Sequence, residues 1–235
     1  MSAFIAEIIG TASILLFGCG VVAGVLLDKS KSNGAGWIVI TFAWAIGVTL
    51  GIYASGQFSG AHLNPAVTIA LAVVGKFSWS LVPSYILAQF IGAMLAAFLV
   101  YLAYLPHWKE TKDAGLKLAV FSTGPAIRNT PANFICEFIA TFILMFAIML
   151  IGANKYADGL GPIAVGILIL GMGLSFGGPT GYALNPARDL GPRIMHAILP
   201  IDGKGDSDWS YSWIPVVAPI CGAVSAALAA TALLP

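Results

Sequence analysis

The sequence predicts an all-α membrane protein in which six transmembrane helices and two half-length helices form an inverted repeat. Two observations lead to this class: the long uncharged stretches of the chain and an Asn-Pro-Ala tripeptide that occurs twice. A third is composition, because 59% of the 235 residues are hydrophobic and only 9% are charged. Soluble domains carry roughly 25% charged residues. The composition therefore excludes a soluble enzyme, a nucleic-acid binder and a disordered protein.

The long apolar segments predict the spanning helices. A helix that crosses a bilayer needs about 20 apolar residues. Divided at its charges, glycines and prolines, the chain gives six segments of about that length: 3–27, 36–56, 79–104, 132–153, 160–177 and 212–234. The charged segments between them are expected to be connecting loops, at 28–31, 105–131 and 199–211. Segment 2–27 contains Glu7 and has no basic start, so it does not read as a cleavable signal peptide.

Two further apolar pieces, 65–75 and 186–198, are too short to cross a bilayer. Each begins at an Asn-Pro-Ala tripeptide, and Asn followed by Pro is a helix-start signature. A short helix at membrane depth is tolerated only where it is buried in protein or lines a cavity. We therefore predict two half-helices that border a cavity. The tripeptides are Asn64-Pro65-Ala66 and Asn185-Pro186-Ala187.

An internal repeat relates the two halves of the chain. Residues 59–66 align with 180–187 at an offset of 121, and five of the eight positions are identical. Three spans in each half make the second half enter the membrane from the opposite side, so that the half-helices meet near the midplane. We expect one channel domain over 1–235, with repeats at about 1–104 and 132–235 joined by the loop 105–131.

The segments SGAHLNPAVTIAL (59–71) and TGYALNPARDLGPR (180–193) resemble those of the aquaporin superfamily, the major intrinsic proteins, in its glycerol-facilitator branch. The resemblance covers the whole chain. It implies the aquaporin fold, a passive channel without enzymatic activity, cofactor or metal, and a multi-pass place in the plasma membrane. The partners that it implies are a small neutral solute, membrane lipid and, in a homotetramer, further copies of the chain, with no nucleic acid.

The half-helix tips are expected to form the central constriction. Asn64 and Asn185 would cap the two helices and turn their amide donors toward the channel. Each helix N-terminus carries about half a positive charge, so two tips that face one point oppose the passage of cations and protons.

Arg188 lies in the first turn of a half-helix, where a cation opposes the helix dipole, and within an apolar region where charge is costly. The resemblance makes it part of a selectivity filter with Trp44, Gly173 and Tyr182. A glycine beside two aromatic residues leaves a wide slot. Tyr182 departs from the phenylalanine frequent in glycerol facilitators, and its hydroxyl would either narrow the slot or add a hydrogen bond.

The residues before each tripeptide are expected to be extended and to line the pore with backbone carbonyls. These are Gly60, Ala61 and His62 in the first half and Thr180, Gly181 and Tyr182 in the second. The His62 side chain is interpreted as a packing group rather than a gate. Asp189 and Arg193, four residues apart on one helix, are expected to form a structural ion pair.

Glu7 and Glu137 are intramembrane carboxylates at equivalent places in the two halves. Such residues suggest proton or ion coupling, and this leaves a proton-coupled secondary transporter as the alternative function. Their symmetric placement favours a structural role, in which they accept hydrogen bonds from the backbone before each half-helix. No metal-binding pair, catalytic pair or nucleotide loop supports an intramembrane enzyme, and no carboxylate ring supports an ion channel.

Several properties stay open at this stage. Glycerol and similar polyols, dihydroxyacetone, urea, hydrogen peroxide, protonated lactic acid and water all fit the predicted filter. The resemblance puts both termini in the cytoplasm, whereas the Lys and Arg distribution does not support that orientation. The three cysteines are interpreted as small hydrophobic residues.

Overall fold

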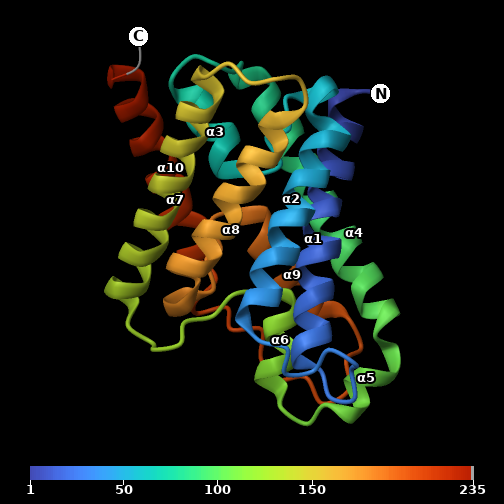
Figure 1. The fold of residues 1–235 in the computed structure, drawn as a ribbon. Helices are drawn as coiled ribbons and strands as arrows, with labels where there is room; N and C mark the ends of the chain where they lie inside the picture. Colours follow the sequence, from blue (N-terminus) through green and yellow to red (C-terminus); the bar gives the residue numbers. More distant parts are fainter. Residues whose placement is uncertain (234–235) are drawn as a thin grey trace.

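A computed structural model describes residues 1–233 (Figure 1). Six of its helices are long and apolar enough to cross a membrane, and the described residues contain no strand. The predicted all-helical class is therefore confirmed. The six are α1 (Ala3–Leu26), α2 (Trp37–Ser59), α4 (Val82–Ala103, preceded by the 3-10 turn η1, Trp79–Leu81), α7 (Thr130–Ala153), α8 (Leu160–Thr180) and α10 (Ile214–Leu233).

The helix ends differ from the predicted ones by a few residues. Helices α2 and α8 each run three residues further than expected, to the residue before a glycine. These glycines, Gly60 and Gly181, have φ of 79° and 83°, a left-handed conformation that ends a helix. Residue 234 of the last predicted span lies outside the described residues.

The two short helices begin where the tripeptides predict. Helix α3 covers Pro65–Val73, and α9 covers Pro186–Ile198. Figure 1 shows α3 in the upper half of the molecule and α9 in the lower half, both among the longer helices, with the two chain ends at the top. The half-helices thus enter from opposite ends, as in an inverted repeat.

The segment 105–131 is more ordered than predicted. The expectation that all of it is loop was wrong, because it contains α5 (Leu105–Glu110) and α6 (Ala114–Phe121). The Asp113 side chain caps α6 by accepting a hydrogen bond from the Gly115 N–H at 2.7 Å. The rings of Trp108 and Phe121, both buried, lie 5.6 Å apart. Helices this short give too little apolar periodicity to be seen in the sequence.

Helices α1 and α4 of the first half pack in the same way as α7 and α10 of the second half. A Cβ added to Gly92 of α4 would lie 2.4 Å from the Ile8 carbonyl oxygen of α1. A Cβ added to Gly222 of α10 would lie equally close to the Phe138 carbonyl oxygen of α7. Small residues that let two backbones touch are typical of helix contacts in lipid. Both halves therefore hold their helices at the same close spacing.

Candidate functional site

A cavity of about 230 Å³ lies where the half-helices meet. Part of its lining consists of apolar side chains of the long helices, among them Val48, Ile52 and Ile169. Two chain segments that lead into the half-helices, 60–64 and 182–185, and Arg188 complete the lining. The cavity therefore combines apolar side chains with hydrogen-bonding groups.

The lead-in segments have an unusual backbone. Ala61 and Leu63 have φ of 53° and 52°, and their equivalents Tyr182 and Leu184 have 40° and 57°. A left-handed conformation costs a residue other than glycine about 1–2 kcal/mol. Four such residues at matching positions must therefore be held in place by other contacts.

Glu7 holds the first lead-in segment. Its carboxylate accepts hydrogen bonds from the backbone N–H of His62 at 3.0 Å and of Leu63 at 2.7 Å. It also accepts from the Ser59 hydroxyl at 2.6 Å and from Gln89 Nε2 at 2.8 Å. The side chain is fully buried. These four donors satisfy a charge that would otherwise be costly in the apolar interior.

Glu137 does the same for the second lead-in segment. Its two carboxylate oxygens accept from the backbone N–H of Ala183 at 3.0 Å and of Leu184 at 3.1 Å. Glu137 is also fully buried. Glu7 and Glu137 thus accept hydrogen bonds from the backbone before each half-helix, as their symmetric placement in the sequence predicts.

The two tripeptide asparagines connect the halves. Asn64 Oδ1 accepts from the Ala66 N–H at 2.8 Å and so caps α3, while its Nδ2 donates to the Leu184 carbonyl at 2.9 Å. Asn185 caps α9 in the same way, and its Nδ2 donates to the Leu63 carbonyl at 2.8 Å. Each amide nitrogen has two hydrogens, so one donor of each remains for the cavity that both residues line. The other tripeptide residues are buried and do not line it: Pro65, Ala66, Pro186 and Ala187.

Arg188 and Trp44 lie together in the cavity lining. The guanidinium carbon is 4.0 Å from the centroid of the Trp44 ring, which is a cation–π geometry. Within residues 1–233 no protein group accepts a hydrogen bond from this guanidinium. Its donors are therefore available to a molecule in the cavity.

Gly173 does not line the cavity but makes room for Tyr182, which does. A Cβ at residue 173 would lie 2.9 Å from Tyr182 Cζ and 2.6 Å from Thr41 Cγ2. The Tyr182 hydroxyl points to this region and is buried, without a hydrogen-bond partner among the described residues. The Trp37 ring packs edge-on against Tyr182, with centroids 5.9 Å apart. The cavity thus meets the tyrosine ring rather than its hydroxyl.

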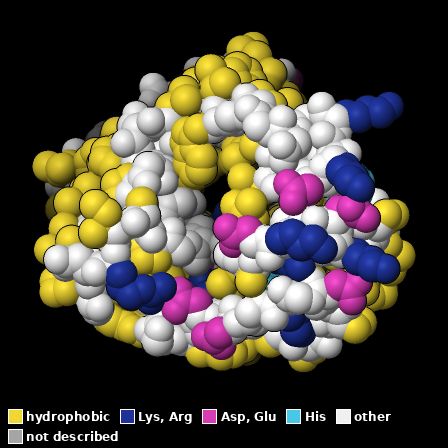
Figure 2. Space-filling view, turned by 90° about the horizontal axis from the view of Figure 1, so that it is seen from below, with side chains coloured by type: hydrophobic (Ala, Val, Ile, Leu, Met, Phe, Trp, Pro, Cys, Tyr) yellow, Lys and Arg dark blue, Asp and Glu magenta, His cyan; other side chains and the backbone are white. Residues whose placement is uncertain are grey.

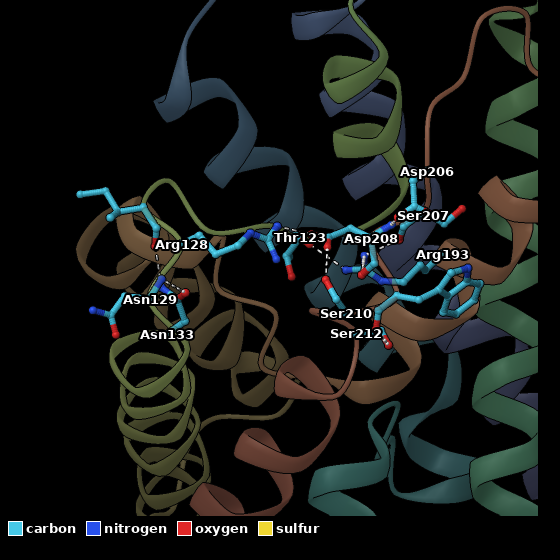
Figure 3. Close-up of polar contacts among 12 residues, drawn as sticks. Thr123, Arg128, Asn129, Asn133, Arg193, Asp206, Ser207, Asp208, Ser210 and Ser212 are labelled. Atoms are coloured by element: carbon cyan, nitrogen blue, oxygen red, sulfur yellow. Dashed lines mark hydrogen bonds and ion pairs between the residues drawn. The ribbon is translucent and has the colours of Figure 1, made fainter.

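Helix α9 is anchored to the loops at its end of the molecule by Arg193, and Figure 3 shows this residue beside Thr123 and Ser207. Arg193 bonds to Asp189 Oδ1 through Nη2 at 2.8 Å, and both side chains are fully buried. Asp189 Oδ2 accepts from the Thr123 N–H and hydroxyl at 2.7 and 2.6 Å. Arg193 also donates to the Ser207 carbonyl at 2.7 Å and to the Thr123 carbonyl at 2.7 Å. Two loops are thereby fixed to the helix that carries Arg188.

A second ion pair joins the same loops nearer the surface. Arg128 Nη2 lies 2.5 Å from Asp208 Oδ2. Partial burial acts to raise the pKa of Asp208, but hydrogen bonds from Arg128 and Ser210 outweigh it and leave the pKa below its usual value. Figure 2 shows charged side chains gathered on this end of the molecule around a hollow, with hydrophobic side chains on the outer rim.

The structure separates the predicted carbonyl-lining residues into two groups. Gly60, Ala61, His62 and Tyr182 line the cavity, whereas Thr180 and Gly181 do not. The expectation that Thr180 is extended was wrong, because it is the last residue of α8, which continues until Gly181 turns the chain.

Sequence analysis missed several partners of the site. Gln89 could have been recognised from the sequence, because it is a polar residue inside an apolar span. Ser59 opens the repeated segment 59–66, but its contact with Glu7 and that of Thr123 with Asp189 come only from the fold.

Comparisons with known proteins agree with this architecture. The family model described as Major intrinsic protein matches residues 1–230. A Thermotoga maritima protein, the "Probable glycerol uptake facilitator protein", is 58% identical over 95% of the chain and 96% of its own length. The "Glycerol uptake facilitator protein" of Bacillus subtilis is 59% identical over 94% of the chain and 81% of its own length. The X-ray structure of the aquaglyceroporin from Plasmodium falciparum superposes with a TM-score of 0.84 at 32% identity, covering 96% of this chain and 93% of that one.

Proposed function

Since the chain belongs to the major intrinsic protein family, we propose that it is a passive pore for glycerol and similar small uncharged polyols. It is a multi-pass protein of the plasma membrane and a channel rather than an enzyme. The relatives in Thermotoga maritima and Bacillus subtilis carry glycerol in their names, and this supports the choice of solute.

The observation that carries the proposal is the mixed lining of the cavity, which combines apolar side chains with hydrogen-bonding groups. Glycerol has a carbon chain with hydroxyls along it, so it needs an apolar surface on one side and hydrogen-bonding groups on the other. Val48, Ile52 and Ile169 supply the first. The free amide donors of Asn64 and Asn185 and the backbone of the lead-in segments supply the second. These groups replace the hydrogen bonds that the hydroxyls of a solute lose when it gives up its water shell.

The same groups support exclusion of ions. Arg188 places an unpaired positive charge in the cavity lining, and the N-termini of α3 and α9 add their partial positive charges beside Asn64 and Asn185. A cation meets repulsion at both points. The donors there orient a water oxygen toward the half-helices, which interrupts a continuous chain of proton transfer.

The proposal includes some water permeability and passage of other small neutral molecules, namely dihydroxyacetone, urea, hydrogen peroxide and protonated lactic acid. It also includes a homotetramer in which each chain has its own pore, as the family resemblance implies. Native mass spectrometry of the protein in mild detergent tests the tetramer, and a monomer as the sole species would contradict it.

Light scattering of proteoliposomes tests the channel. The expected result is fast swelling in glycerol for the wild type, against slow swelling of protein-free liposomes. A Trp44→Ala/Arg188→Val double variant should lose its discrimination among glycerol, urea and lactic acid. The exposed variant Lys29→Met is the control and should behave as the wild type. Glycerol entry no faster than in empty liposomes would overturn the proposal.

The alternative is a proton-coupled transporter that uses Glu7 and Glu137. Their hydrogen bonds to the lead-in backbone favour the structural role instead. Glycerol uptake into vesicles with an imposed pH gradient distinguishes the two. A passive pore equilibrates glycerol with or without an uncoupler, whereas accumulation above the outside level that the uncoupler abolishes would support the transporter.

A further inference from the structure

His62 lies on the cavity wall at the start of the first half-helix. Its ring is held between two aromatic side chains, with centroids 4.5 Å from Phe77 and 5.0 Å from Tyr85. Tyr85 is itself fixed by a hydrogen bond from its hydroxyl to the Ser59 carbonyl at 2.9 Å. The orientation of the imidazole is therefore set by packing before any hydrogen bond is considered.

The hydrogen bonds around Thr68 then decide which ring nitrogen holds the proton. His62 Nδ1 lies 3.2 Å from Thr68 Oγ1. The Thr68 hydroxyl has a single hydrogen, which it donates to the Asn64 carbonyl at 3.0 Å. Toward His62 the hydroxyl must therefore act as an acceptor, and the ring nitrogen that faces it must be the donor.

Gln89 strengthens this assignment. Its Nε2 donates to Glu7 at 2.8 Å and to Thr68 Oγ1 at 3.0 Å, so both amide hydrogens are used. Thr68 Oγ1 then accepts from Gln89 and from His62, which fills its two lone pairs. If His62 Nδ1 had no proton, the Thr68 hydrogen would have to leave the Asn64 carbonyl to reach it. The arrangement in which every bond is made requires the proton on Nδ1.

The other ring nitrogen is left as an acceptor. Nε2 has no hydrogen-bond partner within residues 1–233. It is not buried, so solvent reaches it. In a neutral imidazole whose proton is on Nδ1, Nε2 carries a lone pair. The cavity that His62 lines thus meets a side-chain acceptor on this wall, in addition to the backbone carbonyls.

We propose that His62 is a specificity-determining residue of the pore: the Glu7–Gln89–Thr68 network keeps its proton on Nδ1, so that Nε2 accepts a hydrogen bond from the hydroxyl of a passing solute. The inference rests on the proposed glycerol channel and adds to it a named acceptor for solutes that carry hydroxyl donors. It assigns to Thr68 and Gln89 a positioning role, because they act on the solute only through His62.

Solid-state ¹⁵N NMR of histidine-labelled protein in lipid tests the protonation. The His62 signals are those that vanish in a His62→Phe variant. We expect a protonated Nδ1 and an unprotonated Nε2 in the wild type and in Thr68→Ser, which keeps the hydroxyl. In Thr68→Val the acceptor for Nδ1 is lost, and a population protonated at Nε2 should appear. A wild-type spectrum with the proton on Nε2 would overturn the inference, whatever the channel conducts.

Permeability of proteoliposomes tests the consequence. Phenylalanine keeps the ring between Phe77 and Tyr85 but removes the acceptor. His62→Phe should therefore lower the ratio of glycerol to water permeability by about fivefold, the factor that one neutral hydrogen bond is worth. Thr68→Val should lower it part of the way, and Thr68→Ser should not.

The two proposals fail in different ways. A wild type that does not conduct glycerol would contradict the channel function. A wild type that conducts glycerol beside a His62→Phe variant with an unchanged ratio would contradict the role of His62 alone. Circular dichroism and thermal unfolding of each variant show whether it is folded. The wild-type NMR spectrum decides the protonation without any variant that must fold.

Discussion

The guanidinium of Arg188 stacks on the face of Trp44, with its carbon 4.0 Å from the ring centroid. The indole thus orients the charge without using any of its hydrogen-bond donors. A contact of this kind is worth about 0.5–2 kcal/mol, enough to favour one side-chain orientation. The Trp44 ring therefore holds the Arg188 guanidinium at the cavity without competing with a solute for its hydrogen-bond donors.

Arg188→Val should raise permeability to larger solutes and to cations, because it removes both a bulky side chain and the unpaired positive charge. Proteoliposomes loaded with a potassium-sensitive or pH-sensitive dye measure the ion leak, and light scattering measures a larger polyol. The exposed Arg128→Val variant is the control for loss of an arginine as such. Selectivity equal to that of the wild type would remove Arg188 from the filter.

Gly173→Ala should reduce glycerol permeability more than water permeability. The added methyl would lie 2.9 Å from Tyr182 Cζ and would push that ring toward the cavity. Gly171→Ala is a matched control on the same helix, since a Cβ there meets nothing within 4 Å. Stopped-flow measurements of both solutes give the ratio. Equal effects of the two variants would contradict the packing role of Gly173.

Asp189→Asn should destabilise the protein by about 3–5 kcal/mol, because it leaves the Arg193 guanidinium buried without its counter-charge. The loops at Thr123 and Ser207 should loosen with it. Thermal unfolding in detergent and hydrogen exchange of residues 122–129 measure the two effects. Lys29→Met removes one partner of an exposed ion pair with Glu110 and should change stability little. A fully stable Asp189→Asn protein would show that the pair is dispensable.

The Arg128–Asp208 pair should make stability depend on pH at the acid side. Burial alone would raise the Asp208 pKa, but hydrogen bonds from Arg128 and Ser210 bring it below its usual 3.8. Because the pKa of Asp208 is lower in the folded than in the unfolded protein, its charge stabilises the folded protein at a pH above the unfolded-state pKa. This stabilisation is lost as the pH falls through the folded-state pKa. The difference in melting temperature between wild type and Asp208→Asn should therefore shrink below about pH 4. Asp158→Asn, in the loop after α7, is the control, and a constant difference for Asp208→Asn would count against the pair.

A weak acid that passes should do so undissociated. The cavity lining is largely apolar, so the lactate anion would lose more hydration on entry than the lining replaces, whereas the neutral acid loses less. Lactic acid flux should therefore fall as the pH rises through the pKa of the acid, at constant total concentration. Counterflow of labelled lactic acid at several pH values gives the measurement. Flux proportional to the lactate anion would contradict it.

Much of the fold could be predicted because it depends on local features. Helix length follows from runs of apolar residues, and the half-helices follow from Asn64 and Asn185, whose side chains cap them as the sequence indicates. Helices α5 and α6 could not be predicted, since they are short and owe their position to the contact of Trp108 with Phe121.

The site was less accessible to sequence reasoning because its geometry comes from contacts across the chain. The left-handed φ of Leu63 is held by Glu7, 56 residues away. The family resemblance made Gly173 a filter residue, but in the structure it makes room for the Tyr182 ring and does not itself line the cavity. Such relations appear only when the helices are assembled.

The reciprocal bonds between Asn64 and the Leu184 carbonyl, and between Asn185 and the Leu63 carbonyl, have a consequence for how such a chain can change. In both bonds an asparagine Nδ2 donates to the carbonyl of the leucine before the other asparagine. Two identical copies of one ancestral half would therefore form the same pair of hydrogen bonds. Fusion of a duplicated gene then requires no new interaction at the centre. We expect an insertion in one lead-in segment to be tolerated only if the other lengthens too, because both bonds depend on the spacing between the two asparagines.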